Sequence, residues 1–183
     1  MPFSFKIFVY FVAVIFVEVT AKATFTDCGE SDKKIAIKQG SVKPDPILYP
    51  GNVSVTAGFE VVDDLPSSDL SMILHLTKLE PKRMTVPCLQ NIGSCEYDVC
   101  EMIKNHQTEF CPMFPPHAQC GCPLKKAVYS LTDAPVAIPD FGEIFAKILQ
   151  GGYEGNITFI DKSSGTEVGC IAITFQIEPS ELL

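Results

Sequence analysis

Alternation of apolar and polar residues dominates the chain and predicts β-strands. From position 53 to 61, Val, Ala and Phe alternate with Ser, Thr, Gly and Glu, and Leu and Met share one face of positions 70–76. Near the C-terminus, positions 156–159 and 170–177 alternate in the same way on either side of a turn at Ser163-Ser164-Gly165. A period of two is typical of strands with one apolar face. Several such strands with Pro- and Gly-rich turns predict an all-β protein, an antiparallel sandwich or cup.

Two segments depart from this alternation. The cysteine-rich stretch at 99–107 predicts a short helix, tied down at Cys100. In the second segment, apolar residues follow the i, i+3, i+4, i+7, i+8 spacing of a helix: Phe141, Ile144, Phe145, Ile148 and Leu149. This segment is interpreted either as an amphipathic helix packed on the sheet or as a mobile apolar flap at a cavity mouth or membrane surface. Periodicity alone favours the packed helix.

The N-terminus has the organisation of a signal peptide, which we assign to residues 1–23. Lys6 precedes an unbroken apolar run of eleven residues at 7–17, and Ala21-Lys22-Ala23 offers the small residues that signal peptidase accepts. The alternative, a membrane anchor, needs about 20 apolar residues, and Glu18 interrupts the run before that length. We therefore expect residues 24–183 to form one domain that enters the secretory pathway.

The charge balance argues against one class of partner. Of 14 basic and 22 acidic residues, the leader holds Lys6, Lys22 and Glu18, which leaves 12 basic and 21 acidic residues and a net charge of −9. Nucleic acid requires clustered Lys and Arg side chains, so we expect no nucleic-acid partner. Constant adhesion to an anionic membrane is also disfavoured at neutral pH. Acidification towards the carboxylate pKa of about 4 would reduce this repulsion.

Eight cysteines and two glycosylation sequons agree with a secretory route. Six of the cysteines lie between Cys88 and Cys122, and an even number behind a leader predicts a disulfide framework. Zinc ligation is the alternative, but structural zinc sites contain closely spaced cysteine pairs twice, and only Cys120-Gly121-Cys122 has that spacing. The sequons begin at Asn52 and Asn156, and their use would place both asparagines on the surface.

No catalytic motif accompanies these features. The three histidines, His75, His106 and His117, lie outside metal-binding helix motifs, and neither a Gly-x-Ser-x-Gly elbow nor a Gly-rich phosphate loop occurs. The even cysteine count leaves no thiol spare for catalysis. We therefore expect a protein that is not an enzyme and that uses no metal or cofactor. Such a chain either packs its sheets together or holds them apart around a ligand, and composition leaves both possibilities open.

Short motifs along the whole mature chain carry a resemblance to a known family. They are Phe25-Thr26-Asp27-Cys28, the run from Lys43 to Val53, Val86-Pro87-Cys88, Ile92-Gly93-Ser94-Cys95, Cys120-Gly121-Cys122-Pro123, Tyr129-Ser130-Leu131, Ile138-Pro139-Asp140, Gly152-Tyr153, Ser163-Ser164-Gly165 and Gly169-Cys170-Ile171. In this order, and with all eight cysteines, the chain resembles the sphingolipid-activator branch of the ML lipid-recognition family.

The resemblance implies an antiparallel β-cup around a large apolar lipid cavity, with one short helix and four disulfides. The implied bridges are Cys28–Cys170, Cys88–Cys95, Cys100–Cys122 and Cys111–Cys120, which is one of the 105 pairings that eight cysteines allow. Acyl chains would lie in the cup, with the polar head at its rim. Residues 141–149 would then be the mobile rim loop, so the resemblance favours the flap.

Site residues follow from the same interpretation. We assign to the cavity and its rim Val55, Phe59, Met72, Leu74, Leu76, Met84, Leu131, Phe141, Ile144, Phe145, Ile148, Leu149, Tyr153, Phe159, Ile173 and Phe175. The family's second rim loop carries a Trp-containing apolar tip, whereas this chain has Pro81-Lys82-Arg83-Met84 there and no Trp at all. Lys82 and Arg83 are therefore assigned to contact with anionic lipid heads.

Two functions are compatible with this interpretation. In the first, the protein extracts glycolipids or phospholipids from membranes and presents them to a lysosomal hydrolase resembling β-hexosaminidase, as in ganglioside catabolism. In the second, it is a secreted lipid carrier or recognition module without a hydrolase partner. Both predict transient contact with a membrane surface and a lysosomal or extracellular location.

Overall fold

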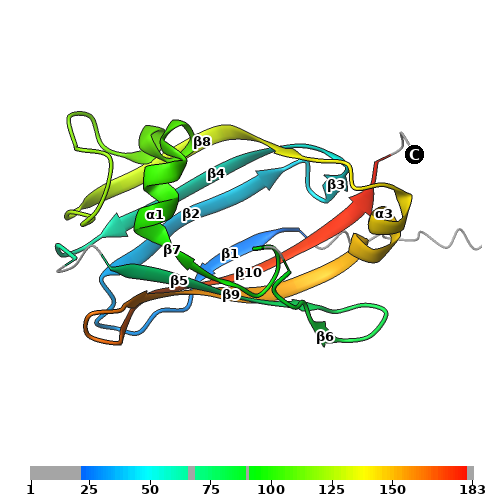
Figure 1. The fold of residues 1–183 in the computed structure, drawn as a ribbon, viewed down its shortest axis with the longest axis horizontal. Helices are drawn as coiled ribbons and strands as arrows, with labels where there is room; N and C mark the ends of the chain where they lie inside the picture. Colours follow the sequence, from blue (N-terminus) through cyan, green and yellow to red (C-terminus); the bar gives the residue numbers. More distant parts are fainter. Residues whose placement is uncertain (1–21, 66–68, 90, 181–183) are drawn as a thin grey trace, which may run out of the picture.

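Two β-sheets face each other in the structure, a computed structural model that describes residues 22–65, 69–89 and 91–180 (Figure 1). The predicted leader, up to residue 21, lies outside the described residues. The larger sheet has the strand order β1-β10-β9-β5-β6, with β3 beside β10 and β7 beside β5, and the smaller sheet has the order β2-β4-β8. Every named pairing is antiparallel except that of β3 with β10. The predicted all-β antiparallel fold is confirmed.

Strands occupy the segments in which apolar and polar residues alternate. The larger sheet consists of β1 (Thr24–Asp27), β3 (Ile47–Tyr49), β5 (Leu70–Lys78), β6 (Met84–Thr85), β7 (Glu96–Asp98), β9 (Gly151–Asp161) and β10 (Thr166–Pro179). The smaller sheet consists of β2 (Ile35–Lys43), β4 (Gly51–Val61) and β8 (Ala127–Ile138). All four alternating segments are therefore strands.

Helical turns are more numerous than the one short helix that the resemblance implied. The described part of the chain contains α1 (Val99–Asn105), α2 (Gln107–Phe110), a 3₁₀ turn η1 (Cys111–Met113) and α3 (Glu143–Leu149). Isolated helices this short are unstable in water, so tertiary attachments must support them. For α1, the Asp98 carboxylate accepts a hydrogen bond from the Glu101 N–H at 2.8 Å. The disulfides Cys100–Cys122 and Cys111–Cys120 hold α1 and η1 against the following loop.

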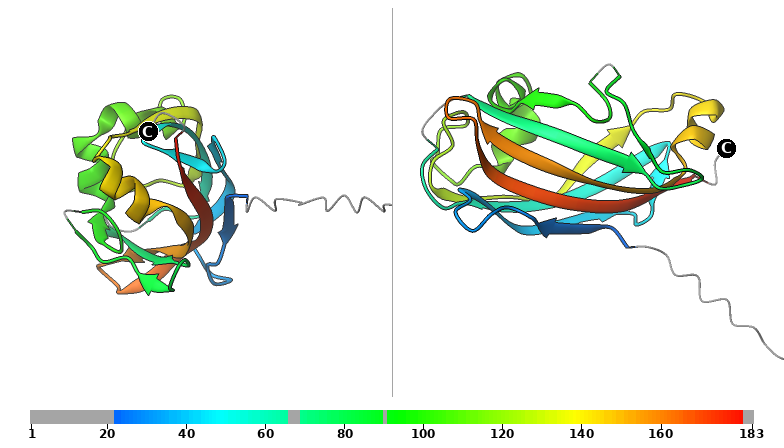
Figure 2. Two further views of the ribbon diagram at one scale, coloured as in Figure 1. Left: turned by 90° about the vertical axis from the view of Figure 1, so that its right-hand side faces the viewer. Right: turned by 90° about the horizontal axis from the view of Figure 1, so that it is seen from below.

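The solid part of the core lies at the end of the molecule that α1 covers (Figure 1). Its members come from both sheets, from α1 and from the loops beside it: Ile35, Val61, Leu65, Leu70, Ile103, Leu124, Tyr129 and Val168. α3 lies at the opposite end, where it faces the viewer in the left panel of Figure 2. The two ends of the molecule therefore differ, since one holds the buried cluster beneath α1 and the other carries α3.

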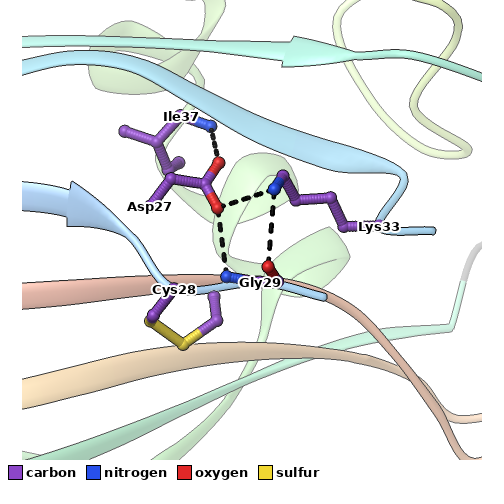
Figure 3. Close-up of a disulfide and its surroundings, with 6 residues drawn as sticks. Asp27, Cys28, Gly29, Lys33 and Ile37 are labelled. Atoms are coloured by element: carbon purple, nitrogen blue, oxygen red, sulfur yellow. Dashed lines mark hydrogen bonds and ion pairs between the residues drawn. A yellow bond between two sulfur atoms is a disulfide. The ribbon is translucent and has the colours of Figure 1, made fainter. Parts of the chain in front are cut away.

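A polar junction joins the two sheets along the edge formed by β1 and β2 (Figure 3). The Asp27 carboxylate, at the end of β1, accepts hydrogen bonds from the backbone N–H of Ile37 on β2 at 2.9 Å and of Gly29 at 3.0 Å. The Lys33 ammonium lies 3.0 Å from the same carboxylate. Next in the chain, Cys28 forms a disulfide with Cys170 on β10. This junction fixes the edge strand β1 to β10 and to the opposite sheet.

All eight cysteines form disulfides, and the pairing is the one that the resemblance implied. Cys28–Cys170 closes a loop with a sequence separation of 142 residues. In chain-entropy models a loop of that length gives on the order of 4–5 kcal/mol of stabilisation. The remaining bridges, Cys88–Cys95, Cys100–Cys122 and Cys111–Cys120, staple the loops that cover one end and one side of the sheets.

Candidate functional site

An apolar cavity of about 220 Å³ lies between the sheets next to α1. The strands contribute Ile35, Ile37, Ala57, Phe59, Leu70, Met72, Tyr129, Ile157, Phe159 and Ile171, and the helical segment and its loop contribute Val99, Met102, Ile103, Phe110, Met113, Phe114 and Leu124. Of these side chains, Tyr129 alone carries a polar atom able to form a normal hydrogen bond. Cavities of roughly 150 Å³ lined in this way stay dry and bind benzene-sized guests. The cavity therefore has room for a short hydrocarbon segment.

Tyr129 lines the cavity with its ring while its hydroxyl is satisfied elsewhere. The hydroxyl donates to the Lys125 carbonyl at 2.9 Å and accepts from the Lys125 N–H at 3.0 Å. Its ring stacks on Phe59 with centroids 5.0 Å apart and meets Phe114 edge-on at 5.1 Å. Burial raises the pKa of Tyr129, so the hydroxyl stays neutral. The wall of the cavity consequently presents hydrocarbon and no charge.

The inward faces of both sheets continue from the cavity towards α3. On the larger sheet, Leu74, Ile157 and Ile171 form one cross-strand row, and the next row contains Leu76 and Ile173. On the smaller sheet, Val55 and Leu131 are the corresponding positions. Except for Ile173, the assigned residues in these rows are only half-buried although they face inward. These half-buried side chains extend the apolar surface of the cavity towards α3, where Tyr153 is buried.

α3 presents its large apolar residues to the outside. Ile144 is 74% exposed and Ile148 is 57% exposed, Phe141 and Phe145 are exposed as well, and only the small Ala146 is buried. The rings of Phe141 and Phe145 lie 5.7 Å apart. The helical spacing of 141–149 therefore predicted the helix correctly, but the packed-helix interpretation that periodicity favoured was wrong. The reason is that periodicity records which residues share a face and not what covers that face.

The attachments of α3 are at its two ends. Before the helix, the buried Tyr49 hydroxyl accepts a hydrogen bond from the Phe141 N–H at 2.7 Å. After it, the Tyr153 hydroxyl donates to the Leu149 carbonyl at 2.7 Å, and the Lys78 ammonium donates to the Ile148 carbonyl. Gly142 and Gly151 flank the segment with φ of 93° and 133°, values that other residues rarely adopt. Hydrogen bonds thus hold the helix at its ends, while most of its large apolar side chains are exposed.

Comparison with known proteins places this arrangement in a family. A family model described as the ML domain matches residues 22–177, which is most of the chain. The chain belongs to the ML-domain family. It is 32% identical over 162 residues to the ganglioside GM2 activator of Macaca fascicularis, with 85% of this chain and 83% of the relative covered. It is 29% identical over 161 residues to the ganglioside GM2 activator of Mus musculus, with 85% of this chain and 81% of the relative covered.

Two solved structures also align with this ML domain. A Niemann-Pick type C2 protein from the Japanese carpenter ant has a TM-score of 0.45 and 14% identity, with 85% of this chain and 99% of that chain covered. Chicken MD-1, solved in complex with lipid IVa, has a TM-score of 0.39 and 12% identity, and the alignment covers 85% of this chain and 98% of that chain.

The predicted site residues of the ML domain fall into three groups. Phe59, Met72 and Phe159 line the enclosed cavity. Further along the inward faces lie Val55, Leu74, Leu76, Leu131, Tyr153, Ile173 and Phe175, with the Tyr153 and Phe175 rings stacked at 5.1 Å. The exposed rim holds Met84, Phe141, Ile144, Phe145 and Ile148, and Leu149 is half-buried there.

The two basic residues predicted to contact lipid heads have different surroundings. Both Lys82 and Arg83 are exposed in the β5–β6 turn. Arg83 forms an ion pair with Glu154, which lies on the outward face of β9. The Arg83 guanidinium is therefore drawn over the outer face of the larger sheet, and it is partly neutralised there.

Sequence reasoning missed the contribution of the helical segment to the cavity. Val99, Met102 and Ile103 of α1 line it, and their i, i+3, i+4 spacing was a usable signal. It also missed Leu89 and Ile92, which are 66% and 62% exposed in the Cys88–Cys95 loop. Of the two tyrosine anchors of α3, it missed Tyr49, whereas Tyr153 was assigned to the cavity and its rim. Over the described ranges, no cluster of His, Cys, Asp and Glu is arranged to hold a metal ion. Within the same ranges, no helix has the length and apolarity to cross a bilayer.

Proposed function

We propose that this ML-domain protein extracts a glycolipid or phospholipid from a membrane, holds its acyl chains between the sheets and presents its head group to a hydrolase. The observation that carries the proposal is the apolar cavity together with the row of inward-facing apolar residues that leads from it to α3. Membership of the ML-domain family and the similarity to two ganglioside GM2 activators support it.

The energetic requirement of extraction accounts for the inward-facing residues. Each methylene transferred into water costs about 0.8 kcal/mol, so a lipid leaves a bilayer only for a site with comparable apolar surface. The cavity of about 220 Å³ accommodates one segment of an acyl chain. The remainder would lie along Val55, Leu74, Leu76, Leu131 and Phe175, and covering these half-buried side chains would bury more apolar area on both partners.

The exposed face of α3 gives the proposal a route for the lipid. The exposed apolar side chains are Phe141, just before α3, and Ile144, Phe145 and Ile148 on it. α3 itself lies at the end of the molecule opposite α1 (Figure 1). Such a surface enters the boundary between lipid head groups and acyl chains, because its burial there removes apolar area from water. Contact of α3 with the bilayer would then bring the opening of the cup to the lipid.

The hydrolase and the location belong to the same proposal. The ganglioside GM2 activators among the relatives support an activator role. The proposed partner is a β-hexosaminidase-like hydrolase in the lysosome, as the family resemblance implies. The alternative, a secreted carrier without a hydrolase, is favoured by one observation. The turn at 81–84 has the exposed Lys82 and Arg83, where the resemblance implies a Trp-containing apolar tip.

Vesicle experiments separate these possibilities. The purified protein is mixed with donor vesicles that contain a fluorescent glycolipid or phospholipid, and transfer to acceptor vesicles is followed. In parallel, β-hexosaminidase is assayed on glycolipid in vesicles and on a water-soluble substrate. We expect transfer, and stimulation on the vesicle substrate alone, because a soluble substrate needs no extraction. Transfer without stimulation would identify a carrier, and absence of both would refute lipid extraction.

A further inference from the structure

The sequon asparagine Asn156 lies on the outer face of the larger sheet, away from the cavity. It belongs to β9, which is paired on one side with β10 and on the other with β5. Its side chain is exposed. The side chains directly opposite are His75 on β5 and Ala172 on β10. A group attached to Asn156 would therefore rest on a broad face of the sheet.

A groove of about 430 Å³ lies beside Asn156 on this face. Besides Asn156, its walls include His75, Thr77, Glu154, Ala172 and Thr174. Thr77, Glu154 and Thr174 form the neighbouring cross-strand row, so their side chains lie within about 7–8 Å of Asn156. The groove is thus next to the acceptor nitrogen.

The chemistry of the groove suits a sugar ring. The Thr77 hydroxyl and the Glu154 carboxylate offer a donor and acceptors to sugar hydroxyl groups. The Thr174 hydroxyl already shares a hydrogen bond with the Thr24 hydroxyl at 2.6 Å and keeps a lone pair to accept another. Ala172 has a single methyl group and leaves room for an N-acetyl group. Arg83 is ion-paired with Glu154, so the acidic wall is balanced by a guanidinium that can donate further hydrogen bonds.

We propose that Asn156 carries an N-linked glycan whose first N-acetylglucosamine lies in this groove. The amide nitrogen of Asn156 forms a bond with C1 of that sugar, which comes from a polyprenyl-diphosphate oligosaccharide donor. The bond between C1 and the diphosphate oxygen breaks, polyprenyl diphosphate leaves, and the amide gives up one proton to a base of the transferring enzyme. Folding then places the sugar against the outer face of β5, β9 and β10.

A glycan at this position would orient the protein. It covers the outer face of the larger sheet with a hydrophilic group, and it leaves α3 and the open end of the cup uncovered. A protein partner would consequently dock on another face. Glycosylation of Asn156 requires passage through the secretory pathway but does not require lipid binding. The outcome of the lipid assays therefore does not decide this proposal.

The first test asks whether Asn156 carries a glycan. The full chain is expressed with its leader in eukaryotic cells, and the secreted protein is treated with peptide N-glycosidase in ¹⁸O-water, which marks each glycosylated asparagine as a labelled aspartate. We expect the label at Asn156, and its loss in Asn156→Gln and in Thr158→Ala. Label at Asn52 alone would overturn the proposal, and label at neither site would overturn it together with the secretory route.

The position of the first sugar is tested with three histidines. His75 lines the groove, whereas His106 and His117 are exposed elsewhere and serve as internal controls. We expect diethyl pyrocarbonate to modify His75 several-fold more slowly in the glycosylated protein than in Asn156→Gln, with no change at the two controls. Trimming to a single N-acetylglucosamine should preserve the protection. If Asn156 carries a glycan and diethyl pyrocarbonate modifies His75 at the same rate as in Asn156→Gln, this placement of the sugar is overturned.

Discussion

Asp27 shows how a single exposed carboxylate joins the two sheets. Burial alone would raise the pKa of Asp27, but the hydrogen bond from the Ile37 N–H, with those from Lys33 and Gly29, lowers it below its ordinary value. The folded state therefore favours the ionised form of Asp27. Its contribution to stability is complete above the unfolded pKa of about 3.9 and is lost as the pH falls through the lower, folded pKa. The junction should consequently survive mild acidification.

Replacing Asp27 by Asn tests this junction. We expect Asp27→Asn to lower the free energy of unfolding by about 1 kcal/mol, because the charged hydrogen bonds are weakened. The difference from the wild type should be equal at pH 7 and pH 5, and it should shrink below about pH 4. Urea unfolding at several pH values measures it. Asp32→Asn, an exposed change in the neighbouring turn, serves as the control, and an equal loss in this variant would contradict the special role of Asp27.

At the scale of elements, α3 is a helix that buries little and whose attachments lie at its ends. Tyr49, Tyr153 and Lys78 bind the backbone at or beside its ends, while the apolar side chains between them remain exposed. Burial raises the pKa of Tyr153, so its hydroxyl remains a hydrogen-bond donor across the physiological range. The fold therefore keeps α3 in place without covering its apolar face.

The apolar face of α3 can be tested with a matched control. Ile148 and Val128 are 57% and 56% exposed, but Val128 lies on β8, away from α3. We expect Ile148→Ser to weaken vesicle binding by about 1 kcal/mol or more, because an exposed apolar side chain no longer enters the lipid. Phe145→Ser combined with Ile148→Ser should slow lipid extraction further without loss of stability. Val128→Ser should change neither, and equal effects at both sites would refute a membrane role for α3.

The β5–β6 turn provides a second prediction at this scale. Because Arg83 is engaged by Glu154, Lys82 should make the larger contribution to anionic membranes. We expect Lys82→Glu to reduce lipid pick-up from anionic vesicles by at least the roughly 1 kcal/mol that a basic residue contributes near such a surface. Added salt should reduce the difference. Neutral vesicles are the control, and an unchanged rate with anionic vesicles would rule out the basic contact.

At the scale of the whole molecule, the protein combines a solid core at one end with an apolar space between its sheets. The disulfides and the buried cluster stabilise the α1 end. Towards α3, the inward-facing Leu74, Leu76 and Phe175 are half-buried, whereas Tyr153 and Ile173 are buried. This division allows an interior that accepts a ligand without relying on that ligand for folding.

Filling the cavity tests whether it is the lipid site. Ala57 lines it, whereas Ala137 is exposed on β8 opposite Asn52. We expect Ala57→Leu to weaken lipid binding roughly tenfold, since displacing two methylenes forfeits about 0.8 kcal/mol each. The midpoint of thermal unfolding should not fall. Ala137→Leu should leave binding unchanged, and normal lipid affinity in Ala57→Leu would place the lipid elsewhere.

Local backbone geometry explains what could be predicted from the sequence. Side chains alternate across a strand and recur every three to four residues on a helix, so positions 53–61, 70–76 and 141–149 revealed β4, β5 and α3 without any tertiary information. The cavity residues Phe59, Met72 and Phe159 were found for the same reason, because each lies on the apolar side of an alternating strand.

Contacts between distant segments decided the rest. Met72 and Leu76 have the same place in the strand pattern of β5, yet Met72 lines the cavity and Leu76 does not. The strand pattern alone does not contain this difference. The pairing of Arg83 with Glu154 and the exposure of Ile148 depend on neighbours that no local period encodes. The sequence by itself determined which residues share a face, and the tertiary structure alone determined what each face meets, since burial and ion pairing are set by segments brought together only by folding.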